Sequence, residues 1–340
     1  MKVLLLASHC VSEHDDVQMF ARMGYDVFAP GGYADPLHPA EAMRPPIPEA
    51  PVHPELEALC HAQRVKHEGE DASWAIDWAK ADLHPDLLDW ADVVIVHHFP
   101  ERWIAGQWGN IRHKRVIWRT CGQSNPDLER YMSALRAEGL QVVRYSPAEE
   151  RAFRPLGMWA GADAVIRFGK DPAEWTGWTG TDAVIGNVTQ RMTERGDHCG
   201  LAWYEQVTAG LPARPAGEYS ERLPGGIGAL AYDDMRAYLR AIRVYLYTGT
   251  QPASYTLGLI EAMMTGVPVV SIGPAQMWLP KLFEGHELAV EWADHPEHAR
   301  AIIAEYLREP DHEASGYVRE RAIDLFGLET ISEQWKDFLQ

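Results

Sequence analysis

The sequence has few cysteines, and none of them lie close together. They stand singly, without the short paired spacings of a zinc site: Cys10, Cys60, Cys121 and Cys199. This pattern indicates neither a disulfide scaffold nor a zinc knuckle. Reduced thiols in a cytoplasmic protein are the interpretation that it favours.

The sequence also lacks a long apolar run. The first apolar segment, residues 3–7, is about as long as one strand, and polar and acidic residues follow it. It is therefore too short for a membrane-spanning helix and does not have the form of a signal peptide. We expect no integral membrane segment and a cytoplasmic location.

Positive charge is scarce relative to negative charge. Lysine and arginine number 31 against 49 acidic residues, which gives a net charge of −18. This balance disfavours nucleic acid as a partner, although a local basic surface could still bind it. Hydrophobic residues make up 46% and charged residues 24% of the 340 positions. Such a composition is that of a globular protein, and the length favours two domains.

Short apolar segments alternate with helical stretches in both halves of the chain. The expected strands are residues 3–7, 25–29, 91–96, 114–119, 141–145, 183–186, 244–247 and 267–271. Among the expected helices are residues 15–23, 74–80, 126–137 (with Asn125 as N-cap), 255–265 and 330–339. Strand–helix–strand units with short connections predict parallel sheets, whose ligands bind at the carboxyl ends of the strands. The expected architecture is α/β, with two Rossmann-like lobes facing a cleft.

Within this architecture, the predicted N-terminal domain is 1–166 and the C-terminal domain is 167–328. A terminal helix, 329–340, is expected to return to the N-terminal lobe. Residues 35–54 are rich in proline and predict a long loop.

The most informative segment is 248–271, which has the form strand, small-residue loop, helix, glycine turn and strand. A helix that opens from small polar residues presents free N–H groups and the positive end of its dipole, which suits phosphate. Glu261 lies inside the apolar helix, one or two turns from that end. Its carboxylate could accept hydrogen bonds from the hydroxyls of a ribose.

This segment resembles the donor-binding segment of family 4 retaining glycosyltransferases of the GT-B fold. The match rests on Glu261-Ala262-Met263 and on residues 266–270, which read Gly-Val-Pro-Val-Val. The resemblance implies that Glu261 binds the donor ribose. It also implies that backbone amides meet the diphosphate at Tyr255, Thr256 and Leu257. An ordinary helix–turn–strand unit is the alternative interpretation.

One position departs from the family pattern. The family has two glutamates eight residues apart, and the first of them falls on Ala253. That carboxylate lies near the transferred sugar in the family. Its absence leaves open the sugar, the stereochemical outcome and catalytic activity itself.

A second resemblance lies in the loop after residue 186. Arg195-Gly196 resembles a Lys-Gly pair whose cation neutralises the donor diphosphate, and Arg191 could replace the family's arginine, whose position Asn187 holds. Arginine can bind phosphate through two hydrogen bonds at once. Solvated surface arginines are the alternative. Residues 167–175 and 330–335 further resemble the family's interlobe segment and final helix.

The first half matches the family only in architecture. His97 and His98 end a buried strand, and either could contact the sugar or take a proton as a catalytic residue; structural histidines are the alternative. Four further positions also end strands and are acceptor-site candidates by place alone: Ser8, His9, Gly122 and Gln123.

Together these features predict a glycosyltransferase that moves a sugar from a nucleotide-sugar donor to a sugar, metabolite or modified-base acceptor. No cofactor or metal is required in this design, because arginines and a helix terminus replace the cation. A sugar-nucleotide epimerase or phosphorylase of the same fold, and a non-catalytic nucleotide-binding scaffold, are the alternatives. The acceptor, the donor base and the oligomeric state are left undetermined.

Overall fold

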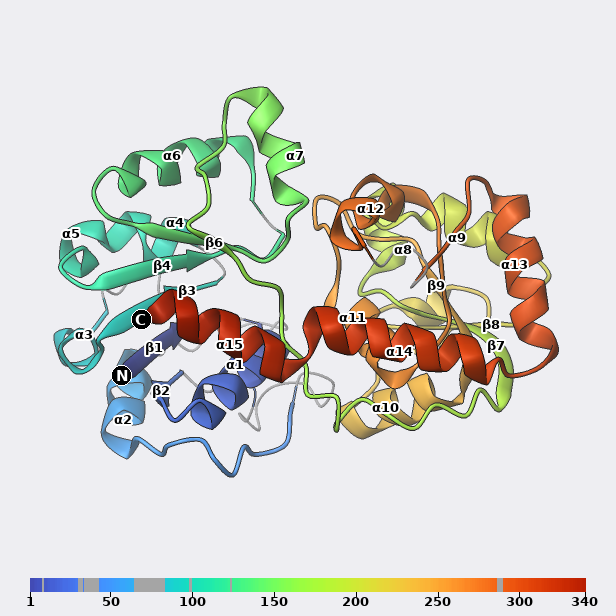
Figure 1. The fold of residues 1–340 in the computed structure, drawn as a ribbon, viewed down its shortest axis with the longest axis horizontal. Helices are drawn as coiled ribbons and strands as arrows, with labels where there is room; N and C mark the ends of the chain where they lie inside the picture. Colours follow the sequence, from blue (N-terminus) through green and yellow to red (C-terminus); the bar gives the residue numbers. More distant parts are fainter. Residues whose placement is uncertain are drawn as a thin grey trace. The chain divides into compact units, whose positions relative to one another are not determined.

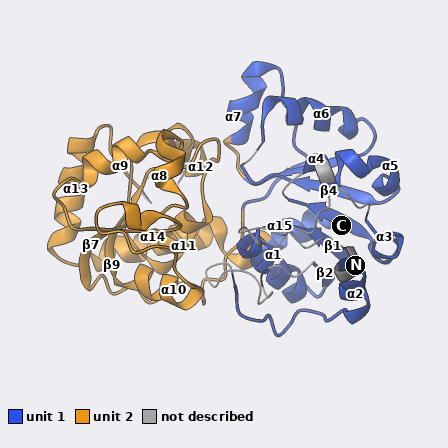
Figure 2. Ribbon diagram, turned by 180° about the vertical axis from the view of Figure 1, so that it is seen from behind, with its two compact units in different colours: residues 1–145, 149–167, 332–340 blue, residues 146–148, 168–331 orange. Residues whose placement is uncertain are grey.

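The computed structural model describes residues 1–7, 9–29, 33, 43–63, 83–97, 100–122, 124–285 and 290–340. The chain divides into two compact units (Figure 2). The first contains residues 1–145, 149–167 and 332–340, and the second contains residues 146–148 and 168–331. Each unit is built around its own parallel sheet.

The sheet of the first unit has the strand order β2-β1-β3-β4-β5-β6, and all of its pairings are parallel. Its strands are β1 (Lys2–Leu6), β2 (Asp26–Phe28), β3 (Val93–Val96), β4 (Arg115–Arg119), β5 (Gln141–Arg144) and β6 (Ala164–Val165). All four residues of β3 are buried. A strand covered on both faces needs apolar side chains on both sides, so β3 shows a continuous apolar run instead of an alternating pattern.

Helices flank this sheet (Figure 1). They are α1 (Cys10–Arg22), α2 (Pro54–Gln63), α3 (Pro85–Trp90), α4 (Pro100–Trp103), α5 (Trp108–Ile111), α6 (Pro126–Arg136) and α7 (Glu149–Phe153). Helix α6 begins where the sequence predicts it. The side chain of Asn125 accepts the N–H groups of Asp127 and Leu128 at 3.1 and 3.0 Å, and Pro126 occupies the first turn, where a missing N–H does no harm.

The sheet of the second unit has the order β11-β10-β9-β7-β8 and is also parallel. Its strands are β7 (Asp182–Val188), β8 (Ala213–Ala216), β9 (Ile242–Tyr247), β10 (Val269–Ser271) and β11 (Glu291–Trp292). Its helices are α8 (Met192–Arg195), α9 (Leu201–Thr208), α10 (Tyr232–Ala241), α11 (Leu257–Thr265), α12 (Leu279–Leu282), α13 (Pro296–Arg308) and α14 (His312–Phe326). A connected apolar core joins the central strands to α9 and α13.

The last helix, α15 (Leu328–Leu339), begins in the second unit, and its residues from Ser332 onward belong to the first. Trp335 is fully buried there and packs edge-on against Phe20, with ring centroids 5.5 Å apart. Arg115 donates two hydrogen bonds of 2.7 Å to the carbonyls of Phe338 and Leu339. A cation at the carbonyl end of a helix stabilises that end. The predicted return of the terminal helix to the N-terminal lobe is confirmed.

Some predicted boundaries are wrong. Helix α1 starts at Cys10 instead of residue 15, and α11 starts at Leu257 instead of residue 255. The short strands β6, β8 and β11 were not predicted. β8 contains Pro215, which disfavours a central strand, but β8 lies at the sheet edge, where proline is tolerated. The predicted helix 74–80 lies outside the described residues.

Candidate functional site

Helix α11 opens at the carboxyl end of β9, as the phosphate-binding prediction requires. Its N-cap residue, Thr256, makes no side-chain cap to the first turn. A Cβ placed on Gly258 would lie 3.4 Å from Cβ of Val188, so the first turn packs closely on the end of β7. The backbone N–H groups that begin at Leu257 therefore lie beside the loop that follows β7, and a helix start of this kind attracts anions.

Tyr255 anchors the loop that leads into this helix. Its ring is buried and contacts the rings of Phe168 and Phe326, with centroids 6.0 and 5.5 Å away. Its hydroxyl accepts the backbone N–H of Phe168 at 3.1 Å. The Tyr255 side chain therefore holds the loop in place, and only its backbone is suited to the predicted diphosphate contact.

Glu261 carries a partner that the sequence did not reveal. The Nζ atom of Lys170 lies 2.7 Å from Oε1 of Glu261, and the two side chains are only 1% and 7% exposed. Lys170 also lies over the indole ring of Trp175, at 5.5 Å from its centroid. A buried carboxylate needs such a counter-ion, because an unpaired buried charge is strongly destabilising. The ribose-binding role of Glu261 stays a prediction, and the structure adds Lys170 as the group that fixes one of its oxygens.

The segment that follows β7 carries the two predicted phosphate-binding arginines: Arg191 is the N-cap residue of α8, and Arg195 is the last residue of that helix. Arg195 is exposed, and among the described residues no carboxylate lies within 4.0 Å of its guanidinium. Arg191 instead forms a close ion pair with Glu194, with 2.6 Å between Nη2 and Oε2. This hydrogen bond from Arg191 lowers the pKa of Glu194. The guanidinium of Arg195 is therefore accessible for the predicted phosphate contact, whereas that of Arg191 is already paired with a carboxylate of the protein.

Asn187 has a structural environment. It is buried in β7, and its side-chain amide donates a 2.9 Å hydrogen bond to the carbonyl of Leu246 in β9. Its backbone N–H donates to the hydroxyl of Tyr238 at 3.1 Å. These contacts tie β7 to its neighbours and engage the amide in the interior of the unit. The predicted donor contact of Asn187 is untested.

In the first unit, His97 belongs to a buried polar cluster. Its Nε2 atom lies 2.9 Å from Oδ2 of Asp16, and Nε of Arg119 lies 3.8 Å from the same oxygen. Burial lowers the pKa of His97, although the Asp16 carboxylate opposes that shift. The arginine is held by the carbonyl of Arg167 at 3.1 Å and by the ring of Trp335, 5.1 Å away. A histidine paired with a carboxylate can accept or release a proton with its ring orientation fixed.

Two other predicted first-unit residues, His9 and Gly122, are among the described residues. His9 is the N-cap residue of α1 and is exposed. Gly122 follows β4 with a φ of 82°, a left-handed conformation that favours glycine. Ser8, His98 and Gln123 lie outside the described residues.

Sequence reasoning missed Asp16 and Arg119 as site residues. Helix α1 buries an unbroken polar series from Ser12 to Asp16. An amphipathic surface helix would expose about half of such residues. Part of this could be read from the sequence, because polar residues directly after a strand are candidates for the functional edge of a parallel sheet.

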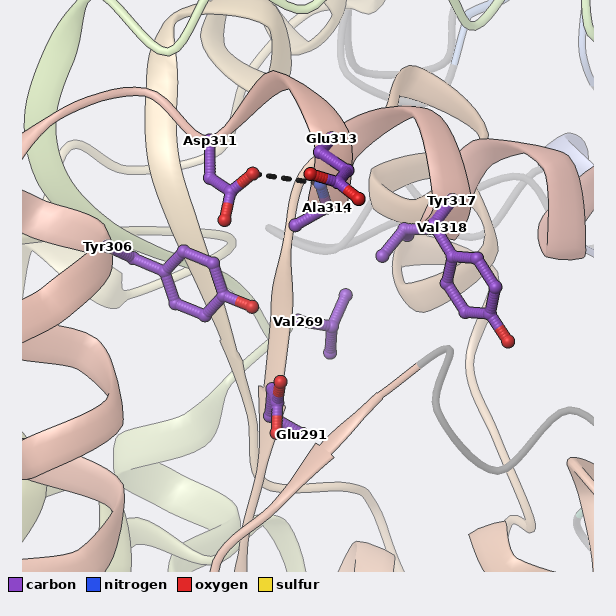
Figure 3. A pocket seen from close by; sticks show the side chains of 8 residues that line it. All are labelled: Val269, Glu291, Tyr306, Asp311, Glu313, Ala314, Tyr317 and Val318. Carbon is purple, nitrogen blue, oxygen red and sulfur yellow. Dashed lines mark hydrogen bonds between the residues drawn. The ribbon is translucent and has the colours of Figure 1, made fainter.

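A cavity of about 350 Å³ lies elsewhere in the second unit (Figure 3). Its lining residues are Val269, Glu291, Tyr306, Asp311, Glu313, Ala314, Tyr317 and Val318. Val269 is the first residue of β10, so this cavity lies at the amino edge of the sheet, whereas α11 starts at the carboxyl edge. Asp311 caps α14 through the N–H of Ala314 at 2.9 Å. The cavity is thus distinct from the predicted donor residues.

Among the described residues, no group of three or more histidine, cysteine, aspartate or glutamate side chains is placed to hold a metal ion. In the same part of the chain, no helix has the length and apolar character needed to cross a bilayer.

Neither a protein-family model nor a protein of curated function matches the chain. Solved structures do match it over its full length. HepE from Anabaena, in complex with UDP-glucose, is 16% identical with a TM-score of 0.65, covering 100% of this chain and 99% of HepE.

Sucrose-phosphate synthase from Thermosynechococcus elongatus is 14% identical with a TM-score of 0.64, and a glycosyltransferase from Rickettsia africae is 13% identical with a TM-score of 0.63. Both comparisons cover 100% of this chain and 98% of the other. The resemblance to family 4 in particular stays a prediction. The two parallel sheets, their flanking helices and the returning terminal helix give this chain the GT-B fold of these glycosyltransferases.

Proposed function

We propose that the protein is a glycosyltransferase that takes a sugar from a nucleotide-sugar donor bound by its second unit. The observation that carries the proposal is the uncapped start of α11, packed on the end of β7 beside the loop of Arg195. The helix start supplies N–H groups and Arg195 supplies a full positive charge. Together they suit a diphosphate without a metal ion.

The nucleoside would extend from the diphosphate toward Glu261, one turn into α11. The Lys170 contact engages Oε1 of that carboxylate, so the proposed ribose contact uses its other oxygen. HepE is described in complex with UDP-glucose, which makes uridine diphosphate sugars the first donors to test. Transfer with retention is part of the proposal because the 248–271 segment resembles retaining enzymes.

In the first unit we assign proton handling to His97, held by Asp16. The lowered pKa keeps the imidazole neutral near pH 7, and a neutral imidazole can accept a proton. Because His97 is only 1% exposed, its ring can contact a substrate only where the residues that cover it make room. The acceptor class is left as a sugar, a metabolite or a modified base.

A non-catalytic nucleotide-binding scaffold is the second candidate, and Ala253 favours it. This half-buried residue closes a short turn with Thr250 and brings no carboxylate to the place where the family's first glutamate would lie. The scaffold would bind nucleotides through the same helix start but would not turn over a sugar.

The deciding experiment is a scan of UDP-, GDP- and ADP-sugars for binding, by melting temperature, and for hydrolysis or transfer. We expect one donor class to stabilise the protein and to release its nucleoside diphosphate. His97→Ala should retain nucleotide binding and lose turnover. Binding of a nucleotide without turnover of any donor would support the scaffold. Absence of both binding and turnover with every donor would refute the proposed function.

A further inference from the structure

One carboxylate in the second unit lies between two guanidinium groups. Oε2 of Glu194 faces Arg191, at 2.6 Å from Nη2 and 2.7 Å from Nε. Oε1 of the same carboxylate faces Arg222, at 3.4 Å from Nη1. The two oxygens of one anionic group thus each meet a different arginine. A phosphate group offers oxygens to two cations in the same way.

The two arginines are held by more than this carboxylate. The ring of Tyr219 contacts both guanidinium groups. Its centroid lies 4.2 Å from Cζ of Arg222 and 5.5 Å from Cζ of Arg191. Cation–π contact keeps a guanidinium in place without neutralising its charge. If Glu194 moved away, the aromatic ring would therefore still hold both cations near each other.

The backbone around the cluster has a costly conformation. Arg191 and Tyr219 are non-glycine residues with φ values of 55° and 62°, in the left-handed region. The N–H of Arg191 donates to the carbonyl of Glu218 at 2.9 Å, which ties the two segments together. Left-handed conformations are costly for residues other than glycine and concentrate at functional sites. The two strained residues therefore lie in the two segments that carry the arginines.

The cluster lies at the edge of the sheet where α11 begins. Arg191 follows the end of β7, Tyr219 and Arg222 follow the end of β8, and β7 is the neighbour of β9, which leads into α11. Parallel strands place their carboxyl ends along one edge. Gly258 in the first turn of α11 packs on the end of β7. The cluster is therefore next to the helix start that suits phosphate.

We propose that Arg191 and Arg222 form an anion site and that Glu194 fills it until a diphosphate takes its place. The anion's identity as the donor diphosphate rests on the proposed function, whereas the two-arginine site itself does not. Exchange is feasible because the three side chains are partly exposed, with accessible fractions of 51% for each arginine and 34% for Glu194. Exposed ion pairs are weak, and a diphosphate brings more charge and more oxygens than one carboxylate.

The test compares Glu194→Gln with wild type in calorimetric titrations of inorganic pyrophosphate and of UDP. Glutamine keeps the size of the side chain but no longer competes as an anion. We expect Glu194→Gln to bind both probes about two- to fivefold more tightly, the range of a weak exposed pair. Adding Arg222→Gln to Glu194→Gln should remove the gain.

Glu305→Gln is the matched control. Glu305 pairs with Arg308 three residues later at 2.5 Å, is also exposed, and lies on α13. The substitution changes the net charge by the same amount, so we expect no gain in affinity. Unchanged or weaker binding by Glu194→Gln, or an equal gain in Glu305→Gln, would overturn the anion site.

The two proposals fail differently. If the anion site is wrong, sugar nucleotides still bind and turn over, and Glu194→Gln leaves their affinity unchanged. If the proposed function is wrong, no sugar nucleotide is turned over, yet Glu194→Gln still gains affinity for pyrophosphate.

Discussion

The buried pair of Lys170 and Glu261 offers a direct test of what holds the donor helix. We consider three variants: Lys170→Met, Glu261→Met and the double substitution. Methionine approximates the length of both side chains and carries no charge. Each single change removes one member of the 2.7 Å pair and keeps the other buried charge, and the double change removes both charges.

The magnitude follows from the burial of the pair. Because the two side chains are 1% and 7% exposed, water does little to replace a lost partner. Removing one member of a buried pair costs about 3–5 kcal/mol, whereas an apolar replacement of both is often close to neutral. We therefore expect each single variant to lose about 3–5 kcal/mol of unfolding free energy and the double variant to lose far less than their sum.

The assay is urea unfolding followed by tryptophan fluorescence, to which the tryptophans of both units contribute, Trp175 beside Lys170 among them. Additive losses in the double variant would refute the reasoning, because they would show that the two charges do not depend on each other. Single losses below about 1 kcal/mol, the range of an exposed pair, would refute it as well.

A conservative variant separates stability from nucleotide binding. Glu261→Gln keeps an oxygen that can accept from Lys170 and loses the charge. If Glu261 also binds the ribose, the folded variant should bind UDP about 10- to 150-fold more weakly, which corresponds to the 1.5–3 kcal/mol of a hydrogen bond to a charged group. Unchanged UDP affinity would leave Glu261 with its structural pair alone.

Three further predictions concern the other site residues. Arg195→Ala should weaken UDP binding much more than uridine binding in parallel titrations, because the lost contact is to phosphate charge; an equal loss for both ligands would contradict this. Wild type should lose thermal stability as the pH falls below about 6.5, because burial lowers the pKa of folded His97 and the unfolded chain then binds more protons. His97→Gln should lose less over the same range, and identical pH profiles would contradict the assignment. Asp16→Asn should reduce turnover more than nucleotide affinity, measured by kinetics and titration, since Asp16 lies 2.9 Å from His97 in the first unit, whereas the proposed nucleotide site lies in the second.

The sequence predicts the fold well because strands buried on both faces leave a clear mark. The run Val93-Val94-Ile95-Val96 and the helix–turn–strand from residue 257 to 271 have the apolar content that a covered parallel sheet requires. Helix starts are predicted less well. Cys10 opens α1 without a side-chain cap from His9, so no capping residue marks the start of this helix.

The candidate site is only partly predictable from sequence because its key pairs join distant positions. Lys170 and Glu261 are 91 residues apart. Glu261 could be picked out from its place in an apolar helix, but nothing local to it indicates a lysine partner. The same holds for Asp16 and His97, which lie in different strand–helix units and meet because β1 and β3 are neighbours in the sheet.

The path of α15 has a consequence for how the protein is made. The first unit lacks Trp335, and with it the ring over Arg119, until residues 332–340 leave the ribosome. At translation rates of 5–20 residues per second, the interval between residues 167 and 332 takes about 10–30 s. During that time the second unit is still being synthesised, and Phe20 and Arg119 lack the Trp335 ring that packs on them in the finished first unit. The earlier-made half of the chain is thus the later to be completed, and a chaperone that binds nascent chains would find its target there.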